Sequence, residues 1–323
     1  MLVRISKDWD FPHIMRQTPL SSNRWGEIEF TTEDINECDL LIVLNRPHDD
    51  IKIKAREVWI MSQESPVTIY KWHTDSFKYF DKVFSFWDKK YGKNIISIQT
   101  ALPWHIGKNY DELKAINTED LSYKKDRVSW VTSNASHKPG HKLRMNFKNF
   151  LQEQNFDFDL FGRGFNQIED KFNGIFPFKY SIAIENDACD DYWTEKIADC
   201  FLSYSVPIYF GAKKITKYFP KESMILINPE NPQESLDIIN ASLSENYWQK
   251  NFEALQEARN LVLEKYQFFP CVSDMIEKYN IKEQKMKHYY IPSNNPAILK
   301  RFKEKFKNNR KIFKANIRNF FNV

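Results

Sequence analysis

The length and composition of the chain suit a protein with two domains of ordinary size. It has 323 residues, of which 42% are hydrophobic and 15% aromatic, enough to bury two cores. It holds only eight glycines and no G-x-x-x-x-G-K-[ST] run, which argues against Gly-rich phosphate loops. The net charge of +4 is uneven: residues 299–319 hold nine Lys or Arg and one Glu, so the remainder is mildly acidic.

Cysteine usage and hydropathy indicate where such a chain would work. The N-terminus has no apolar segment of signal length, and no apolar run reaches about eighteen residues. We therefore predict a cytoplasmic protein, soluble or peripheral on the inner face of the membrane, without a signal anchor. The spacing of the four cysteines does not fit a zinc site, so we expect each to be a free thiol in a reducing compartment. They are Cys38, Cys189, Cys200 and Cys271.

Residues 1–125 alternate short apolar runs with polar or amphipathic stretches. Such alternation predicts a parallel sheet flanked by helices. The predicted strands are residues 2–5, 28–30, 40–44, 57–61, 83–86 and 95–98.

One carboxylate in this first domain, Glu64, follows the strand predicted at residues 57–61. Side chains just beyond the carboxyl end of a strand face the ligand cleft in α/β domains. Pro66 stiffens the turn that presents Glu64. Glu64 is therefore a candidate catalytic residue, and the alternative is a solvated carboxylate at the start of a helix.

Residues 126–285 are predicted to form a second domain. A strand at residues 127–132 leads through a polar loop into a helix at residues 141–152, which carries Arg144. The donor fork of a guanidinium suits phosphate oxygens, although Arg144 could equally be an exposed helix charge. We assign no metal site to the D-x-D pattern at residues 157–159, because it runs into a predicted strand.

Residues 178–211 have the pattern of a βαβ unit, and such units place ligand sites where strands end and helices begin. Residues 180–184 alternate as a strand does. Apolar residues at helical spacing follow in residues 197–202, and residues 206–210 form the next predicted strand.

The helix of this unit has an unusual first turn. Thr194 suits the N-cap and Glu195 suits the positive end of the helix dipole, but Lys196 does not. A bound anion would compensate for the misplaced cation, since helix N-termini hold phosphates. In the alternative interpretation, Lys196 points into water or pairs with Asp190 or Asp191.

Residues 286–323 are predicted to form a basic tail, and residues 297–321 read as an amphipathic helix. Lysines and arginines surround one apolar stripe, a pattern typical of helices on anionic membranes. We expect membrane contact through residues 297–323, with packing on the body or on a second subunit as the alternative. No nucleic-acid module accompanies the charge, so no nucleic-acid partner is expected. The stripe consists of Leu299, Phe302, Phe306, Phe313, Ile317 and Phe320.

Several ordered motifs resemble the α-1,3/1,4-fucosyltransferases, glycosyltransferase family 10, of bacterial type. The donor-binding signature of that family is similar to Glu185-Asn186, Tyr192-x-Thr194-Glu195-Lys196 and Val206-Pro207-x-x-x-Gly211. Further segments that resemble the family are Glu64-Ser65-Pro66, the stretch that ends at Arg144, and Phe161-Gly162-Arg163. Trp193 departs from the family pattern, which has a small residue there.

The resemblance implies an α/β fold of the GT-B type, in which two Rossmann-like domains face each other across a cleft. Residues 1–125 would be the acceptor side and residues 126–285 the nucleotide-sugar side. The implied reaction is an inverting transfer from GDP-β-L-fucose to an oligosaccharide that contains GlcNAc or Glc. It would need no cofactor, with a divalent metal at most stimulatory. Glu64 resembles the catalytic base, and the implied donor-binding residues are Arg144, Asn186, Tyr192, Thr194, Glu195 and Lys196.

Two other functions are compatible with the sequence. One is a related transferase that uses another nucleotide sugar, because the motifs report the diphosphate better than the sugar. The other is a non-catalytic scaffold that keeps the fold and works through its basic tail. A donor screen would identify the first, and an occluded cleft or absent GDP binding would indicate the second.

Overall fold

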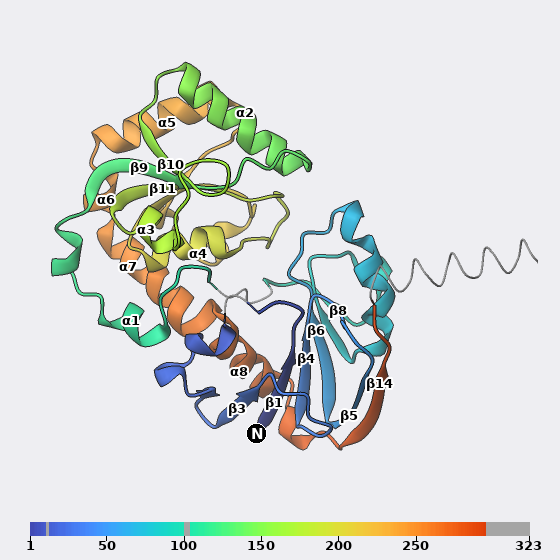
Figure 1. The fold of residues 1–323 in the computed structure, drawn as a ribbon. Coiled ribbons are helices and arrows are strands. Elements are labelled where there is room, and N and C mark those ends of the chain that lie inside the picture. The colour runs from blue at the N-terminus through green and yellow to red at the C-terminus, as the bar shows by residue number, and fades with distance from the viewer. Residues whose placement is uncertain (11–12, 100–103, 295–323) are drawn as a thin grey trace, which may run out of the picture.

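The first domain is built on a seven-stranded sheet. The computed structural model describes residues 1–10, 13–99 and 104–294 and contains two α/β domains (Figure 1). Neighbouring strands of the first sheet are parallel, except for the pair β2–β3. In spatial order the strands are β2 (Arg24–Trp25), β3 (Ile28–Thr31), β1 (Leu2–Ser6), β4 (Leu40–Leu44), β6 (Glu57–Met61), β7 (Lys82–Phe84) and β8 (Ile95–Ile96).

Both faces of this sheet are covered, which explains the unbroken apolar runs of its central strands. All five residues of β4 and all five of β6 are buried. Alternate residues of β4 enter separate cores, with Leu40 and Ile42 in one and Leu41 and Val43 in the other. A sheet buried on both faces needs such continuous hydrophobic strands.

The second domain has a five-stranded sheet in which every pair of neighbouring strands is parallel. Its spatial order is β10 (Phe158–Phe161), β9 (Lys125–Val131), β11 (Phe178–Ile184), β12 (Val206–Phe210) and β13 (Ile225–Leu226). The α-helices of this part of the chain are α1 (Tyr110–Ala115), α2 (Pro139–Glu153), α3 (Lys171–Ile175), α4 (Glu195–Leu202), α5 (Pro232–Ser244), α6 (Tyr247–Lys250) and α7 (Phe252–Leu261). The predicted α/β class, the helix at residues 141–152 and the βαβ unit are confirmed.

The chain returns to the first domain after the second. Helix α8 (Phe268–Lys278) contributes Phe268 and Phe269 to the core beneath β1 and β4, and the ring of Phe269 meets Phe30 edge-on at 4.8 Å. In Figure 1, α8 reaches from the second domain down to β1 and β3. This return begins at α8, ahead of the predicted domain limit at residue 285.

The predicted tail starts in a β-strand rather than a helix. Strand β14 (Lys287–Ile291) pairs antiparallel with β5 (Ile51–Ala55) at the edge of the first domain. The helix predicted within residues 297–321 lies outside the described residues. Every helix that the structure describes is too short or too polar to span a bilayer.

Candidate active site

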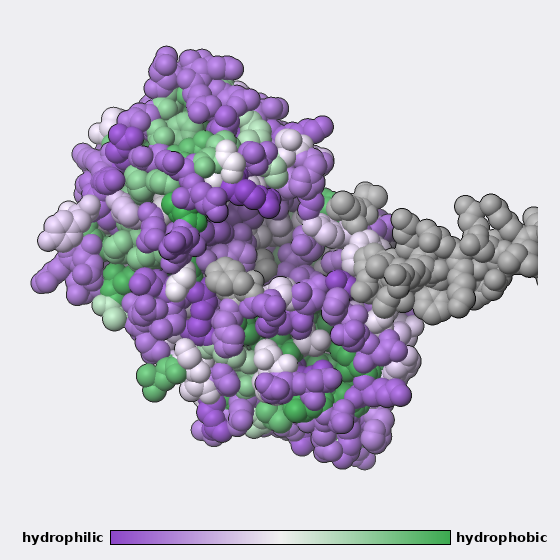
Figure 2. Space-filling model, viewed as in Figure 1, coloured by the Kyte–Doolittle hydropathy of each residue, from purple (hydrophilic) through white to green (hydrophobic). Residues whose placement is uncertain are grey.

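A cavity of about 580 Å³ lies in the second domain, where parallel strands end and α4 begins. Residues from the ends of β9 and β11 line it, together with the start of α4. This is the position where open α/β sheets bind ligands. Figure 2 shows a hollow between the two lobes whose visible walls are mainly hydrophilic. Of the predicted donor-binding residues, three line the cavity: Arg144, Glu195 and Lys196.

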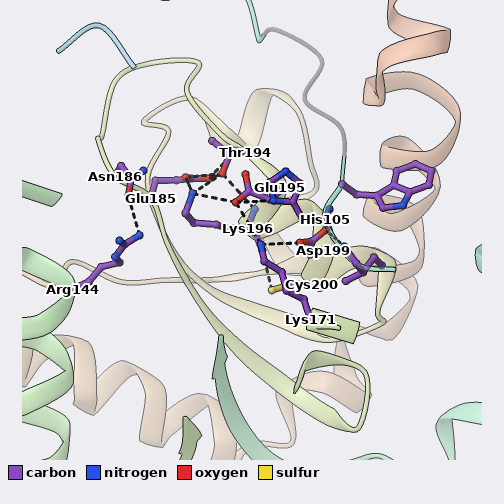
Figure 3. Close-up of polar contacts among 12 residues, drawn as sticks. His105, Arg144, Lys171, Glu185, Asn186, Thr194, Glu195, Lys196, Asp199 and Cys200 are labelled. Carbon is purple, nitrogen blue, oxygen red and sulfur yellow. Dashed lines mark hydrogen bonds and ion pairs between the residues drawn. The ribbon is translucent and has the colours of Figure 1, made fainter. Parts of the chain in front are cut away.

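A buried carboxylate, Glu185, organises the start of α4 (Figure 3). It follows β11 directly and has no solvent exposure. The hydroxyl of Thr194 donates to this carboxylate at 2.8 Å and the backbone N–H of Thr194 at 2.7 Å. The Thr194 hydroxyl also accepts the N–H of Lys196 at 3.4 Å, which confirms the predicted N-cap. The turn that begins α4 is therefore fixed to the end of the strand.

Lys196 is held by the same carboxylate. Its Nζ lies 2.9 Å from Glu185 Oε2, 2.9 Å from Thr194 Oγ1 and 3.6 Å from Glu195 Oε1. Burial alone would lower the pKa of Lys196, but the carboxylates of Glu185 and Glu195 raise it. An ammonium has three N–H donors. Two are used in the hydrogen bonds to Glu185 and Thr194, so one remains for a ligand.

The alternative pairing of Lys196 with Asp190 or Asp191 is not found. Asp190 pairs instead with Lys214 at 2.7 Å, and Asp191 accepts the hydroxyl of Tyr218 at 2.7 Å. The sequence suggested these two aspartates because they lie close along the chain. Glu185 takes their place because α4 begins at the edge of the sheet where β11 ends, so the strand end lies directly beside the helix start.

Glu195 belongs to a second polar group that sequence reasoning missed. Its Oε1 lies 3.6 Å from Nζ of Lys171 and 3.8 Å from Nδ1 of His105. Burial would raise the pKa of Glu195, but neighbouring charges, Lys196 foremost, hold it well below its usual range. Glu195 is thus an ionised hydrogen-bond acceptor at the edge of the cavity.

Asp199 completes this group one helical turn after Glu195. It accepts the backbone N–H of His105 at 2.9 Å and lies 3.5 Å from Nζ of Lys171. The four-residue spacing from Glu195, which puts both carboxylates on one face of α4, was a usable signal. No sequence spacing indicates His105 or Lys171. His105 lies in the connection between the two domains and Lys171 lies in α3, and folding places both segments beside Glu195.

Arg144 faces the cavity from α2 and is only 5% exposed. Its Nη1 donates to Oδ1 of Asn186 at 2.9 Å, while its Nε has no partner within the described residues. A Cβ at Gly140 would lie 2.1 Å from the carbonyl oxygen of Asn186, so only glycine allows α2 to start this close. The arrangement leaves guanidinium donors available to an anion.

Glu64 stands in the first domain, outside the lining of this cavity, but within electrostatic reach of Lys196 and Glu195. Burial and the nearby charge of Glu195 raise the pKa of Glu64. A hydrogen bond from Tyr70 and the charge of Lys196 lower that pKa in part. Glu64 therefore shares one electrostatic neighbourhood with the start of α4. Tyr192, which is 3% exposed, packs edge-on against Phe86 of the first domain at 5.2 Å. Tyr192 thus lies at the contact between the domains rather than in the lining of the cavity.

The two aspartates of the D-x-D pattern are held by a neighbouring arginine. Asp157 and Asp159 of the D-x-D pattern both pair with Arg127, at 2.8 and 2.9 Å. Within the described ranges, no group of three His, Cys, Asp or Glu side chains is placed to hold a metal ion. All four cysteines are free thiols.

Comparison with known proteins agrees with this geometry. The model of glycosyltransferase family 10 (fucosyltransferase), C-terminal part, matches residues 121–269. The chain is 34% identical over 82 residues, 25% of its length, to GDP-fucose protein O-fucosyltransferase 3 of Danio rerio. It is 31% identical over 77 residues, 24% of its length, to alpha-(1,3)-fucosyltransferase FucT of Helicobacter pylori. The matched stretches span 18% and 16% of these relatives' own lengths.

The fold likeness extends over both domains. A crystal structure of an alpha1,3-fucosyltransferase superposes with a TM-score of 0.51 at 16% identity, covering 83% of this chain and 90% of that one. This likeness supports the predicted GT-B arrangement of the two domains. Residues 121–269, a little under half of the chain, therefore match the C-terminal part of glycosyltransferase family 10, the fucosyltransferases.

Proposed function

We propose that this protein transfers L-fucose from GDP-β-L-fucose to a hydroxyl of a GlcNAc- or Glc-containing glycan, with an α-1,3 linkage and inversion at the anomeric carbon. One arrangement carries the proposal. Two cationic side chains that keep unused N–H donors, Arg144 and Lys196, belong to the second domain, and the carboxylate of Glu64 belongs to the facing domain within their electrostatic neighbourhood. The family match and the names of the relatives support fucose as the sugar.

The donor would bind at the start of α4. Lys196 and Arg144 would neutralise the diphosphate, and fixed donors of this kind stabilise the charge that develops on the leaving GDP. Glu195, which stays ionised, would accept hydrogen bonds from ribose hydroxyls. Asn186 would orient Arg144 through its side-chain oxygen.

Glu64 would act as the general base. The acceptor hydroxyl oxygen attacks the anomeric carbon as the bond from that carbon to GDP breaks, and the hydroxyl proton passes to the Glu64 carboxylate. Burial raises the pKa of Glu64, which makes it a stronger base than an exposed carboxylate. The scaffold alternative predicts an occluded cleft or absent GDP binding. The cavity of about 580 Å³ argues against the first of these, and GDP titration tests the second.

A donor and acceptor screen tests the proposal directly. We expect fucosylated product from GDP-fucose with N-acetyllactosamine or lactose, and no product when GDP-mannose or UDP sugars replace the donor. Turnover should persist in EDTA, because Arg144 and Lys196 supply the positive charge. Product from another nucleotide sugar, with none from GDP-fucose, would refute the choice of donor while leaving a glycosyltransferase.

Membrane contact through residues 297–323 is a separate part of the proposal and is carried by the sequence alone. We expect the full chain to co-sediment with vesicles that contain phosphatidylglycerol at low salt, because basic residues near a surface gain about 1 kcal/mol each. Removal of residues 297–323 should abolish co-sedimentation and leave turnover of a soluble acceptor unchanged. Full-length protein that stays in the supernatant would show that the tail has another role.

A further inference from the structure

Two side chains, Tyr70 and Lys138, connect Glu64 to the second domain. The reaction proposed above assigns neither of them a role. Tyr70 lies in the 3-10 segment Thr68–Tyr79, after β6 in the first domain, and its hydroxyl is hydrogen-bonded to Glu64. Lys138 is the N-cap residue of α2 in the second domain. Its Nζ contacts the Tyr70 hydroxyl and lies 4.6 Å from the centre of the Tyr70 ring.

The chemistry of these groups fixes the direction of both hydrogen bonds. A lysine ammonium can only donate, so the oxygen of Tyr70 accepts from Lys138. The Tyr70 proton is then free to donate to the Glu64 carboxylate, which as an ionised group only accepts. The Lys138–Tyr70–Glu64 chain therefore favours the ionised form of Glu64, the form that a base needs, because a carboxylate is a stronger acceptor than a neutral carboxyl group.

We propose that Tyr70 and Lys138 are positioning residues for Glu64. Tyr70 orients the carboxylate, and Lys138 holds the Tyr70 hydroxyl from the facing domain, so the base is correctly placed only while the domains touch at this point. The role of Glu64 as a base rests on the proposed function, whereas the contact itself does not.

The location of Lys138 connects the base to the donor site. Lys138 and Arg144 stand on the same helix, α2, and Arg144 lines the cavity. A lysine at a helix N-terminus opposes the helix dipole, and the side chain of Lys138 makes no capping hydrogen bond there. The contact between Lys138 and Tyr70 explains why a lysine stands at this unfavourable position. Lys138 thus links Glu64 to the helix that carries Arg144.

The charged and titratable groups that face Glu64 determine the expected effect of each change. They are Tyr70, Lys138, Lys196, Glu195 and Tyr192. The Tyr70 hydrogen bond and the two lysines lower the pKa of Glu64, against burial and Glu195, which raise it. Loss of the Tyr70 hydroxyl or of the Lys138 charge must therefore raise the pKa of Glu64 further. The acidic limb of kcat/KM, which reports the ionisation of the base, should move to higher pH.

The test compares Tyr70→Phe, Lys138→Met and Lys138→Arg with two matched controls. Tyr79→Phe removes an exposed hydroxyl from the same 3-10 segment, and Lys142→Met removes an exposed charge one turn further along α2. The primary measurement is the titration of Glu64 by NMR of ¹³C-labelled glutamate carboxyls, assigned from the signal that Glu64→Gln removes. The second is the pH profile of kcat and kcat/KM, with the Kd for GDP and Tm recorded alongside.

We expect Tyr70→Phe and Lys138→Met to raise the pKa of Glu64 and to lower kcat at neutral pH on the order of tenfold, the loss of one charge-assisted hydrogen bond. Lys138→Arg should restore both values, and the controls and the Kd for GDP should match wild type. A Glu64 titration that is unchanged in both variants would overturn the inference. Tyr70→Phe removes only one oxygen, so it decides the matter even if Lys138→Met fails to fold. If wild type transfers no fucose, the proposed function fails, yet the titration still decides whether Tyr70 and Lys138 control Glu64.

Discussion

Replacement of Glu64 with Gln is expected to lower kcat by about 10²–10⁴-fold, the usual contribution of a general base. The amide keeps the shape of the side chain and can still accept the Tyr70 hydroxyl, but it cannot take a proton from the acceptor sugar. GDP affinity should stay close to wild type, because the donor-binding residues lie on the second domain. The measurement is initial-rate fucosyl transfer together with GDP titration calorimetry.

Glu33→Gln, at an exposed carboxylate of the first domain, is the control and should leave both quantities unchanged. In wild type, kcat/KM should fall as the pH drops through the pKa of Glu64, because the base must be ionised. Burial raises that pKa, so the fall should begin at higher pH than an exposed glutamate would give. Glu64→Gln with near wild-type turnover would remove Glu64 from the mechanism.

Replacement of Lys196 with Met is expected to have two separable effects. It should weaken GDP binding by about 1–3 kcal/mol, the value of a hydrogen bond to a charged group. It should also lower the free energy of unfolding by about 3 kcal/mol, because the fully buried carboxylate of Glu185 loses its counter-ion. The measurements are GDP titration calorimetry and urea unfolding.

A second substitution separates the two effects. In the double variant Lys196→Met/Glu185→Gln, no buried charge is left unpaired, so most of the stability should return while GDP binding stays weak. Lys214→Met breaks the exposed pair with Asp190 and should leave both stability and GDP binding close to wild type, because solvent screens an exposed ion pair. A double variant that binds GDP like wild type would show that Lys196 serves Glu185 alone.

Local patterns in the sequence were enough to predict the elements that carry the site. The buried strand at residues 57–61 and the helix around Arg144 follow from runs of apolar residues at strand or helix spacing. The N-cap at Thr194 follows from the preference of hydroxyls for that position. Each of these features depends on residues that are close along the chain.

The features that the sequence did not reveal depend on contacts between distant segments. Strand β14 pairs with β5 across most of the chain, and its alternating polar residues gave no sign of that partner. His105 and Lys171 reach Glu195 only because the domain connection and α3 pack against α4. Glu185 was visible in the motif, but its role as the counter-ion of Lys196 required the placement of β11 beside α4.

The return of α8 to the first domain constrains how the molecule can open. The polypeptide passes between the domains twice, once between β8 and β9 and once between α7 and α8. Two bodies joined at two points rotate most easily about the line through both joints, whereas a single tether would permit every direction. Opening of the mouth for substrate entry is therefore expected to follow one hinge axis, with twisting and sliding suppressed.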